Sequence, residues 1–405
     1  FKNKNIATQL IRAIASQCFI NEYIYPISKK EEELLYKLEM KINNNIKKNI
    51  KKMYLEIACL AAYKPLYKYI WSNKIINIKE ISFVINQQIT DPLKEKHIKK
   101  EISVKKIKNI ISKKVKDQYE SNPYPRWEKI SLYKNPKKPL NFFRNLNLNI
   151  NEKNIEKWKN IDVLVAGCGT GQHAITTATK YENSHVTAID LSANSLSFAK
   201  RKADELNIKN IDFIQMDLLD LKKNKKKYNI IESVGVLHHM SNPFEGWNIL
   251  NEALQPNGLI MIGLYSKSAR KHIERIRSKL NKMKVEVNNK SIINFREEII
   301  EHNIDDYKLI KESPDFYSLS NLRDLLFHVQ EHRFTIPEIK NYLKKMKLKF
   351  CGFENEIIIN LFKKSYKNFN DLYDLDLWND FEYKNPRVFA GMYQFWCQKN
   401  ESFEI

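Results

Sequence analysis

The sequence of 405 residues has little glycine, few cysteines and no long apolar run. All nine glycines lie at or after Gly167, so the first 166 residues contain none. A long segment without glycine and with few prolines favours helices over tight hairpins. No uninterrupted apolar stretch reaches the roughly 18 residues that a membrane-spanning helix needs. We therefore predict a chain without a membrane span whose first part is helical.

The five cysteines are widely spaced and include no C-x-x-C pair. This pattern excludes a disulfide framework and predicts no metal site of the zinc type. The first residues, Phe-Lys-Asn-Lys-Asn, lack the apolar core of a secretory signal. We expect a protein of the reducing cytoplasm.

The charge is strongly unbalanced, with 69 basic against 47 acidic residues and a net charge of +22. Residues 1–116 hold 25 basic and 10 acidic side chains, which is about two thirds of the excess. A basic face suits nucleic acid, an acidic protein or a membrane surface. Lysine accounts for 58 of the basic residues, however, and an A/T-rich genome also produces such a bias. Both explanations stay open at this point.

The periodicity of the chain predicts five segments. Apolar residues recur at helical spacing in residues 1–116, which indicates an all-helical domain for dimerisation or substrate docking. Residues 117–158 contain four prolines and open with the aromatic stretch Tyr-Glu-Ser-Asn-Pro-Tyr-Pro-Arg-Trp at 119–127. Closely spaced prolines hold the backbone extended, so we predict an ordered arm that covers a ligand.

From residue 159 onward, strands alternate with helices. Strands are predicted at 161–165, 185–189, 211–215, 228–233 and 258–264, with helices between them. This alternation predicts parallel βαβ units and a doubly wound α/β sheet over 159–265. Residues 266–335 form a charged helical insertion, and 336–405 contain the last two strands, the final one at 389–397.

A glycine loop follows the first of these strands, in Ala-Gly-Cys-Gly-Thr-Gly at 166–171. Without side chains, the backbone can turn tightly and approach a bound nucleoside closely. The spacing differs from the G-x-G-x-x-G of dinucleotide folds, and no phosphate-binding G-x-x-x-x-G-K-[ST] is present. The loop alone is therefore weak evidence.

Two aspartates lie at the ends of the next two predicted strands, at the same edge of the sheet as the loop. Asp190 ends the second strand about 20 residues after the loop, where a carboxylate can accept hydrogen bonds from both ribose hydroxyls. Asp217 ends the third strand, in position for an adenine amino group. An isolated aspartate after a strand is usually a helix cap, but two in register with a glycine loop predict a nucleoside site.

The order of these elements resembles the class I S-adenosylmethionine-dependent methyltransferases, over about residues 117–400. The resemblance implies a Rossmann-like sheet of seven strands whose last strand is antiparallel, with S-adenosylhomocysteine as the product. It also implies a set of cofactor contacts: Tyr119, Tyr124, Arg126, Trp127, Gly167, Cys168, Gly169, Gly171, Asp190, Leu191, Asp217, Leu218, Ser233 and Val234. Ala166 departs from the family, because many relatives carry an acidic residue there.

Four stretches carry a more specific resemblance, to a subgroup of this family. They are 118–127, the Gly-Gln-His-Ala at 171–174, the Gly-Val-Leu-His-His-Met at 235–240, and 325–334. Together they resemble bacterial enzymes that join this catalytic domain to an N-terminal helical region. The outer-membrane-protein lysine methyltransferases of obligate intracellular bacteria are similar. This resemblance implies a protein substrate and a homodimer formed through residues 1–116.

Methyl transfer to an amine requires a neutral nucleophile, an acceptor for one proton and aromatic walls for the positive charge. His238 and His239 follow the fourth strand and are candidate bases, although packing would explain them equally well. Tyr119 and Trp127 are candidate walls. His328, Glu331 and His332 share one face if their segment is helical, and with Tyr265 we expect them to line the substrate pocket.

We predict N-methylation of protein lysine side chains as the activity, with a small metabolite as the second candidate and RNA as the third. Enzymes that methylate exocyclic base amines usually carry Asn/Asp-Pro-Pro-aromatic after the fourth strand. This chain has Glu-Ser-Val-Gly there, at 232–235, and no recognisable nucleic-acid module. A methyltransferase fold kept only as a binding scaffold is a further alternative, which the intact loop and both aspartates disfavour.

Overall fold

The computed structural model describes residues 4–46, 49–105 and 107–400. They form two compact units, one of residues 1–100 with 276–327 and one of 101–275 with 328–405. No helix in the described ranges combines the length and the apolar composition of a membrane span.

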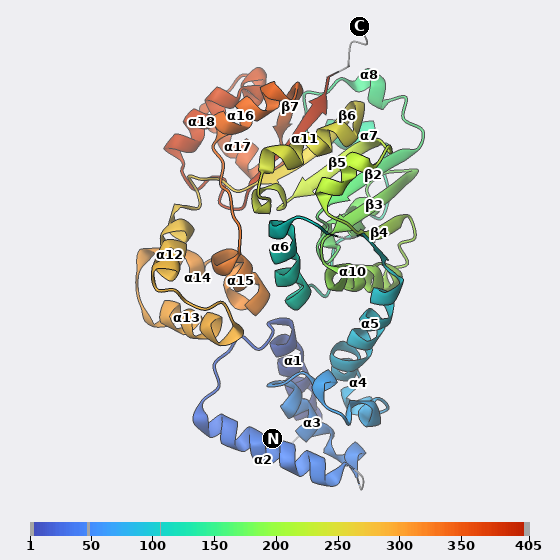
Figure 1. Ribbon diagram of the computed structural model, residues 1–405, viewed down its shortest axis with the longest axis vertical. Coiled ribbons are helices and arrows are strands. Elements are labelled where there is room, and N and C mark those ends of the chain that lie inside the picture. The colour runs from blue at the N-terminus through green and yellow to red at the C-terminus, as the bar shows by residue number, and fades with distance from the viewer. Residues whose placement is uncertain (1–3, 47–48, 106, 401–405) are drawn as a thin grey trace. The chain divides into compact units, whose positions relative to one another are not determined.

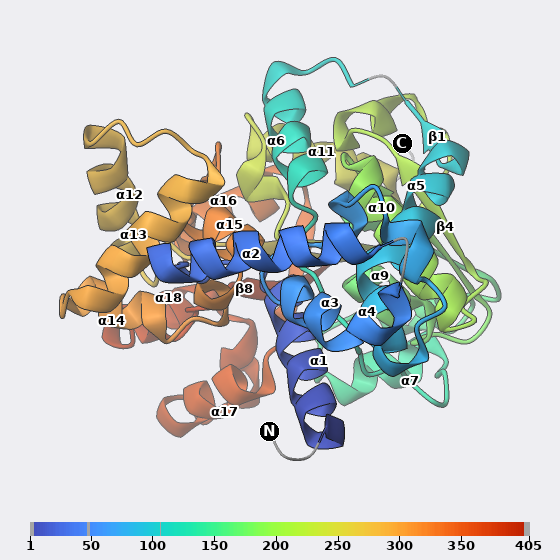
Figure 2. The ribbon, with the colours of Figure 1, turned by 90° about the horizontal axis from the view of Figure 1, so that it is seen from below.

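The first unit is helical. Its N-terminal helices pack mainly through α1 against α3 and through α2 against α3, and Figure 2 shows α2 crossing this group. A core of buried aliphatic side chains, Ile57, Leu60 and Ile81 among them, holds the helices together. The N-terminal helices are α1 (Lys4–Ile20), α2 (Lys29–Asn45), α3 (Tyr54–Ala61), α4 (Ser82–Ile85) and α5 (Asp91–Glu101).

The helical insertion belongs largely to this first unit. Glu22 accepts a hydrogen bond from Ser320 N at 2.6 Å, which caps the start of α15, and Leu319 N donates to Asn21 O at 3.3 Å. Arg296 lies over the ring of Tyr25 at 5.4 Å. These contacts join the N-terminal helices to the inserted helices, which are α12 (Lys271–Lys282), α13 (Asn289–Glu301), α14 (Asp305–Lys311) and α15 (Leu319–Phe327).

The second unit is built on one twisted sheet with the order β1-β4-β3-β2-β5-β6-β8-β7 (Figure 1). The pairs from β1 to β6 are parallel, and β8 is antiparallel to both β6 and β7. The strands are β1 (Ser103–Val104), β2 (Ile161–Ala166), β3 (Ser184–Asp190), β4 (Ile211–Gln215), β5 (Tyr228–Val234), β6 (Leu254–Leu264), β7 (Leu348–Phe353) and β8 (Tyr393–Lys399).

Nine helices in the described part of this unit accompany the sheet. Helix α10 packs on β3 and β4, and α11 packs on β6. They are α6 (Ile110–Ser121), α7 (Pro139–Asn145), α8 (Glu152–Ile155), α9 (Gln172–Ala178), α10 (Ala193–Glu205), α11 (Pro243–Ala253), α16 (Ile336–Lys345), α17 (Glu356–Ser365) and α18 (Leu375–Lys384).

The α/β class and the antiparallel last strand are confirmed, but the predicted count of seven strands is wrong by one. The additional strand, β1, has only two residues, both exposed, and pairs with the edge strand β4. A strand this short shows no alternating pattern, and its sequence lies among helix-forming residues.

The compact units divide the chain differently from the predicted domains in two places. Residues 101–116 pack with the sheet, through β1 and through contacts of α6 with α10. Residues 276–327 of the predicted insertion pack with the N-terminal helices. Both differences depend on contacts between segments far apart in sequence, which periodicity does not reveal.

Candidate active site

The glycine loop lies where the sheet changes direction. Strand β2 is flanked by β3 on one side and β5 on the other, so the connections leave it in opposite directions along the sheet. In open α/β sheets the crevice for a ligand lies at such a switch point, beyond the carboxyl ends of the strands. The loop 167–171 follows β2 at that point.

The loop backbone takes a conformation that favours glycine. Gly167, Gly169 and Gly171 have φ angles of 77°, 53° and 83°. A Cβ on Gly169 would lie 2.8 Å from the carbonyl oxygen of Tyr124, and a Cβ on Gly167 would lie 2.3 Å from a methyl group of Val236. Both the backbone angle and the lack of space therefore require glycine here.

We predict that Gly169→Ala lowers the free energy of unfolding by about 1–3 kcal/mol, because alanine is strained at this φ and meets the Tyr124 carbonyl. Urea unfolding of the purified chain measures the change. Gly391→Ala is the matched control, since a Cβ there meets nothing within 4 Å, and it should change stability by no more than about 0.5 kcal/mol. Equal losses in both variants would contradict the clamped geometry of the loop.

The aromatic arm is fixed to this loop by two hydrogen bonds. The hydroxyl of Thr170 donates to Pro125 O, and the indole Nε1 of Trp127 donates to Thr170 O at 3.1 Å. The Trp127 ring is buried, edge-on to Phe198 at 5.7 Å and under Lys202 Nζ at 5.3 Å. Trp127 thus ties the arm to both the loop and α10, and its predicted catalytic role stays a prediction.

The start of the arm is helical and not extended as predicted. Residues 118–121 close α6, so Gln118 and Glu120 lie on its last turn. The Glu120 carboxylate accepts from Ala193 N at 3.0 Å and Asn194 N at 3.1 Å, at the N-terminus of α10. An anion at a helix N-terminus satisfies orphan N–H groups and interacts favourably with the dipole. Tyr119 stacks on Tyr124 at 6.4 Å, and both are half-buried.

Asp190 lies at the end of β3, next to the loop. Its Oδ2 accepts from Gly169 N and its Oδ1 from Ser192 N, each at 2.8 Å. Burial raises the pKa of this carboxyl, and the backbone N–H groups of Ser192, Gly169 and Leu191 act in the opposite direction. A carboxylate offers about four lone-pair sites, so each oxygen keeps a second site for another donor.

Asp217 caps the 3₁₀ turn Leu218–Lys223, accepting from Leu219 N at 3.0 Å. It is buried, as is Leu218, which belongs to the main core of the sheet unit. Cys168 is also buried in the loop, and Leu191 is half-buried after β3. The cap that an aspartate after a strand usually makes is therefore present here, and the adenine contact stays a prediction.

The two histidines after β5 have different surroundings. His238 is fully buried, its ring stacks on Tyr265 at 3.8 Å, and neither ring nitrogen has a hydrogen-bond partner in the part of the chain that the structure describes. Burial, followed by the nearby His239 and Arg270, lowers the pKa of His238 well below its usual value. His239 Nδ1 lies 2.7 Å from Gln330 O, and its ring stacks on His328 at 3.6 Å.

The segment 328–335 is not helical, which corrects the expected spacing of His328, Glu331 and His332 on one helix face. It runs as an irregular strap along the end of β5, where His332 N donates to His238 O at 2.7 Å. The strap still brings the predicted residues together, because its path is fixed by backbone bonds such as this one.

Glu331 binds Arg270, with Nη2 to Oε2 at 3.0 Å, and both side chains are buried. The Arg270 guanidinium lies 3.6 Å from the ring centre of Tyr265. Tyr265, His238, His239 and the strap thus form one cluster beyond the carboxyl ends of β5 and β6. Sequence reasoning missed Arg270, which contacts the selected residues Glu331 and Tyr265, and Glu120, which accepts from the N-terminus of α10.

Comparison with known proteins agrees with this geometry. Residues 157–349 match the family model described as "Methyltransferase domain". Residues 157–349 form a methyltransferase domain. The glycine loop, Asp190 and the histidine cluster all lie within it, so the fold is that of the class I S-adenosylmethionine-dependent methyltransferases.

Named relatives cover parts of the chain. An uncharacterized protein of Synechococcus sp. is 27% identical over 201 residues, 48% of each chain. A probable (S)-tetrahydroprotoberberine N-methyltransferase of Papaver bracteatum is 35% identical over 80 residues, 20% of this chain and 22% of that protein. The structure of PKMT2 from Rickettsia typhi in complex with AdoHcy matches with a TM-score of 0.49 and 16% identity, over 69% of this chain and 56% of that one. The chain spans about half or less of the length of these curated relatives.

The residues of the methyltransferase domain fit S-adenosylmethionine. The left-handed glycines leave the loop backbone without side chains at the switch point, where a nucleoside can approach. The Asp190 carboxylate keeps acceptor sites for ribose hydroxyls beside its two backbone bonds. The arm residues Tyr124 and Trp127 are fixed against the same loop.

The strand that precedes the histidines carries a buried ionic network. Glu232 on β5 is fully buried and pairs with His173 Nε2 at 2.6 Å and Lys180 Nζ at 3.1 Å. Burial acts to raise the pKa of this carboxyl, but the Lys180 ammonium and the hydrogen bonds from His173 and Thr177 lower it far below its usual value. Ser233 is also fully buried, and Val234 is half-buried with its side chain close to Gly263 of β6. Glu232 therefore has a structural role, and the cofactor contacts of Ser233 and Val234 stay predictions.

Proposed function

We propose that this chain transfers a methyl group from S-adenosylmethionine to amine nitrogen, with lysine side chains of a protein as the substrate. The observation that carries the proposal is the clamped glycine loop with the Asp190 carboxylate beside it, at the switch point of a methyltransferase domain. A scaffold without activity would not need both features.

The residues around the loop have separate tasks. S-adenosylmethionine, when bound, supplies an electrophilic methyl group on a sulfonium. The glycines let the backbone approach the nucleoside, and Asp190 holds the ribose hydroxyls. The arm, through Tyr119 and Tyr124, provides the aromatic faces that favour a positive charge. Holding the reactants in line is the main contribution of such a site.

We assign proton acceptance to His239 and not to His238. His239 Nδ1 lies 2.7 Å from a carbonyl oxygen, so this nitrogen carries the proton and the lone pair of the neutral ring is at Nε2. The ring nitrogens of His238 have no hydrogen-bond partner among the described residues and the ring stacks on Tyr265, so the neutral ring serves as an apolar support. A lysine amine must lose one proton to react, and His239 Nε2 is the acceptor that we propose.

The helical unit supports a protein substrate. Residues 1–100 of this unit lie outside the matched methyltransferase domain, and they carry an excess of basic side chains. Helix α1 also exposes Ile6, Leu10 and Ile14 at four-residue spacing, which is one apolar stripe. We propose this stripe as the contact between two copies of the chain in a homodimer.

A small amine is the second candidate substrate. The Papaver relative is named an N-methyltransferase of a tetrahydroprotoberberine, and its 35% identity over 80 residues exceeds that of the longer match.

We predict that the purified chain transfers labelled methyl groups from S-adenosylmethionine to protein in a native lysate. Protease should release the label from the macromolecular fraction, and nuclease should not. Acid hydrolysis should then yield labelled methyl-lysine. The Asp190→Ala variant serves as the inactive control. Label only in the small-molecule fraction would support the second candidate, and release by nuclease would overturn both.

A further inference from the structure

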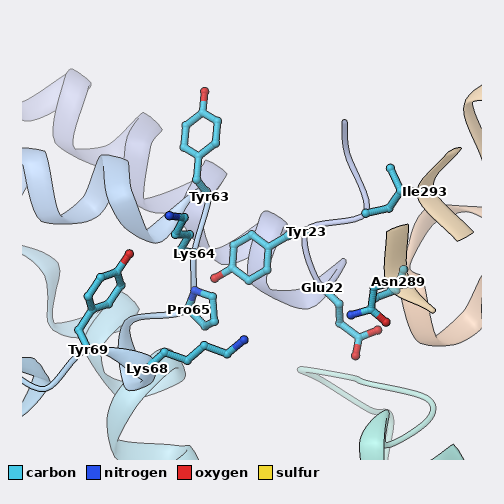
Figure 3. A pocket seen from close by; sticks show the side chains of 10 residues that line it. Glu22, Tyr23, Tyr63, Lys64, Pro65, Lys68, Tyr69, Asn289 and Ile293 are labelled. Atoms are coloured by element: carbon cyan, nitrogen blue, oxygen red, sulfur yellow. The ribbon is translucent and has the colours of Figure 1, made fainter. Parts of the chain in front are cut away.

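The helical unit contains a pocket of about 390 Å³ between the turn after α1, the segment 65–69 and helix α13 (Figure 3). The ring of Tyr23 lies in the middle of it, next to Pro65. Ile293 and Leu319 add apolar surface from the inserted helices. A pocket of this size accommodates one or two side chains of a partner.

The backbone beneath the pocket is strained. Glu22 and Tyr23 have φ angles of 56° and 55°, the left-handed region that residues other than glycine rarely adopt. Two bonds hold this turn in place: Glu22 accepts from Ser320 N at 2.6 Å, and the Tyr23 hydroxyl donates to Ala61 O at 3.2 Å. Strain of this kind persists where surrounding contacts fix it, and it clusters at ligand sites.

Most polar groups around the pocket already have partners. The Tyr63 hydroxyl donates to Glu31 at 3.1 Å. Lys64 Nζ binds Glu39 at 2.9 Å, and the Tyr69 hydroxyl donates to the same carboxylate. These side chains therefore shape the walls and offer little charge to a ligand.

Two polar side chains differ from the rest. Lys68 and Asn289 are exposed at the pocket, and neither side chain hydrogen-bonds or pairs with any other described residue. In Figure 3 the Lys68 side chain extends below Pro65 and Tyr23, and Asn289 lies beside Glu22. An ammonium group and an amide are thus left to recognise a ligand that enters next to Tyr23.

The charged side chains around the pocket indicate whether that ligand is an anion or a cation. Three tyrosines could surround a cation, but Lys68 lines the same pocket with no counter-charge among the described residues and would repel one. The other charged groups of the lining are engaged, Lys64 with Glu39 and Glu22 with Ser320 N. Residues 1–100 hold 19 basic and 9 acidic side chains, so the surrounding field also favours an anion. Apolar surface next to one cation fits a carboxylate beside an aromatic or aliphatic side chain.

We propose that this pocket docks an acidic segment of the protein substrate, with one aromatic or aliphatic side chain against Tyr23 and a carboxylate on Lys68. The proposal rests on the proposed protein substrate. It adds a second place of contact with that substrate, distinct from the reacting atoms, and the chemistry of that contact. Such a contact raises the affinity for the substrate and leaves the chemical step unchanged.

The test measures binding of a fluorescent octapeptide, one tyrosine flanked by glutamates, to the full chain by anisotropy, without cofactor. Lys68→Glu should weaken binding at least tenfold. Lys37→Glu, an exposed lysine of α2 that does not line the pocket, is the matched control and should stay within twofold. Replacing the peptide tyrosine by serine should also weaken binding tenfold, and unchanged melting temperatures should show that the variants fold.

Three outcomes would overturn the proposal. They are no binding of the peptide, equal losses in both lysine variants, and tighter binding of a single-stranded oligonucleotide of the same charge that also depends on Lys68. Because the assay involves no methyl transfer, its result is independent of the labelling experiment. A chain that methylates lysate protein but fails this test would retain the proposed function and lose only the docking site.

Discussion

Asp190→Ala should lower the affinity of the chain for S-adenosylhomocysteine by about 100-fold or more in titration calorimetry. Two hydroxyl bonds to a charged acceptor contribute about 1.5–3 kcal/mol each, and the variant loses both. It also leaves Gly169 N and Ser192 N without their acceptor, which loosens the loop. Both effects lower the affinity for S-adenosylhomocysteine.

A thermodynamic cycle of two proteins and two ligands separates the loss of the hydroxyl bonds from the loosening of the loop. In the native chain, the 2′-deoxyribose analogue of S-adenosylhomocysteine should bind about tenfold more weakly than the parent compound. In Asp190→Ala the two compounds should bind equally, because the partner of the hydroxyl is gone. Asp212→Ala, an exposed carboxylate on the adjacent strand β4, is the control and should bind like the native chain. Unchanged affinity in Asp190→Ala would refute the ribose contact.

Glu232→Ala should lower the free energy of unfolding by about 3–5 kcal/mol, since it removes the carboxylate that pairs directly with the buried Lys180 and leaves only the more distant Glu354. Glu245→Ala is the matched control, because Glu245 makes a similar pair with Lys222 at 2.6 Å in which both side chains are exposed. That variant should lose less than about 1 kcal/mol. Urea unfolding at neutral pH measures the stability of both variants. Equal losses of unfolding free energy would show that burial does not account for the contribution of the Glu232 network.

The same carboxylate predicts a pH dependence. The pKa of Glu232 is lowered in the folded state, so its stabilisation is present above the usual glutamate pKa near 4.5 and declines as the pH falls below it. The native chain should therefore lose stability on acidification more steeply than Glu232→Gln. Parallel pH profiles of the two would contradict the depressed pKa.

Much of the catalytic fold could be predicted from the sequence because its signals are local. The strand around Val163 is a short apolar run, as a parallel strand buried on both faces requires, and the strand around Phe213 has buried residues at every second position. The glycines at 167, 169 and 171 marked the loop because left-handed backbone restricts the residue type. Asp190 was found because its place at the end of a strand is also a sequence position.

The errors concern contacts between distant segments. The strand at Ser103 has two residues and exists only because β4 presents an unpaired edge beside it. The strap with His328 has helical spacing in sequence, but backbone bonds to His238 and neighbouring segments hold it in an irregular path. The buried network of Glu232 could not be predicted, because the side of the strand that this residue faces cannot be read without knowing where Lys180 lies.

By itself, the sequence determined that this chain has a nucleoside-binding α/β domain of the methyltransferase type and a basic helical region. Those features depend on residue type and spacing along one strand, helix or loop. Only the tertiary structure decided that the inserted helices complete the helical unit, that Glu120 and Trp127 fix the arm to the loop and α10, and that His239 and His238 differ in hydrogen bonding. Each of these depends on which polar groups find a partner after the chain has folded, and that is a property of distances in space.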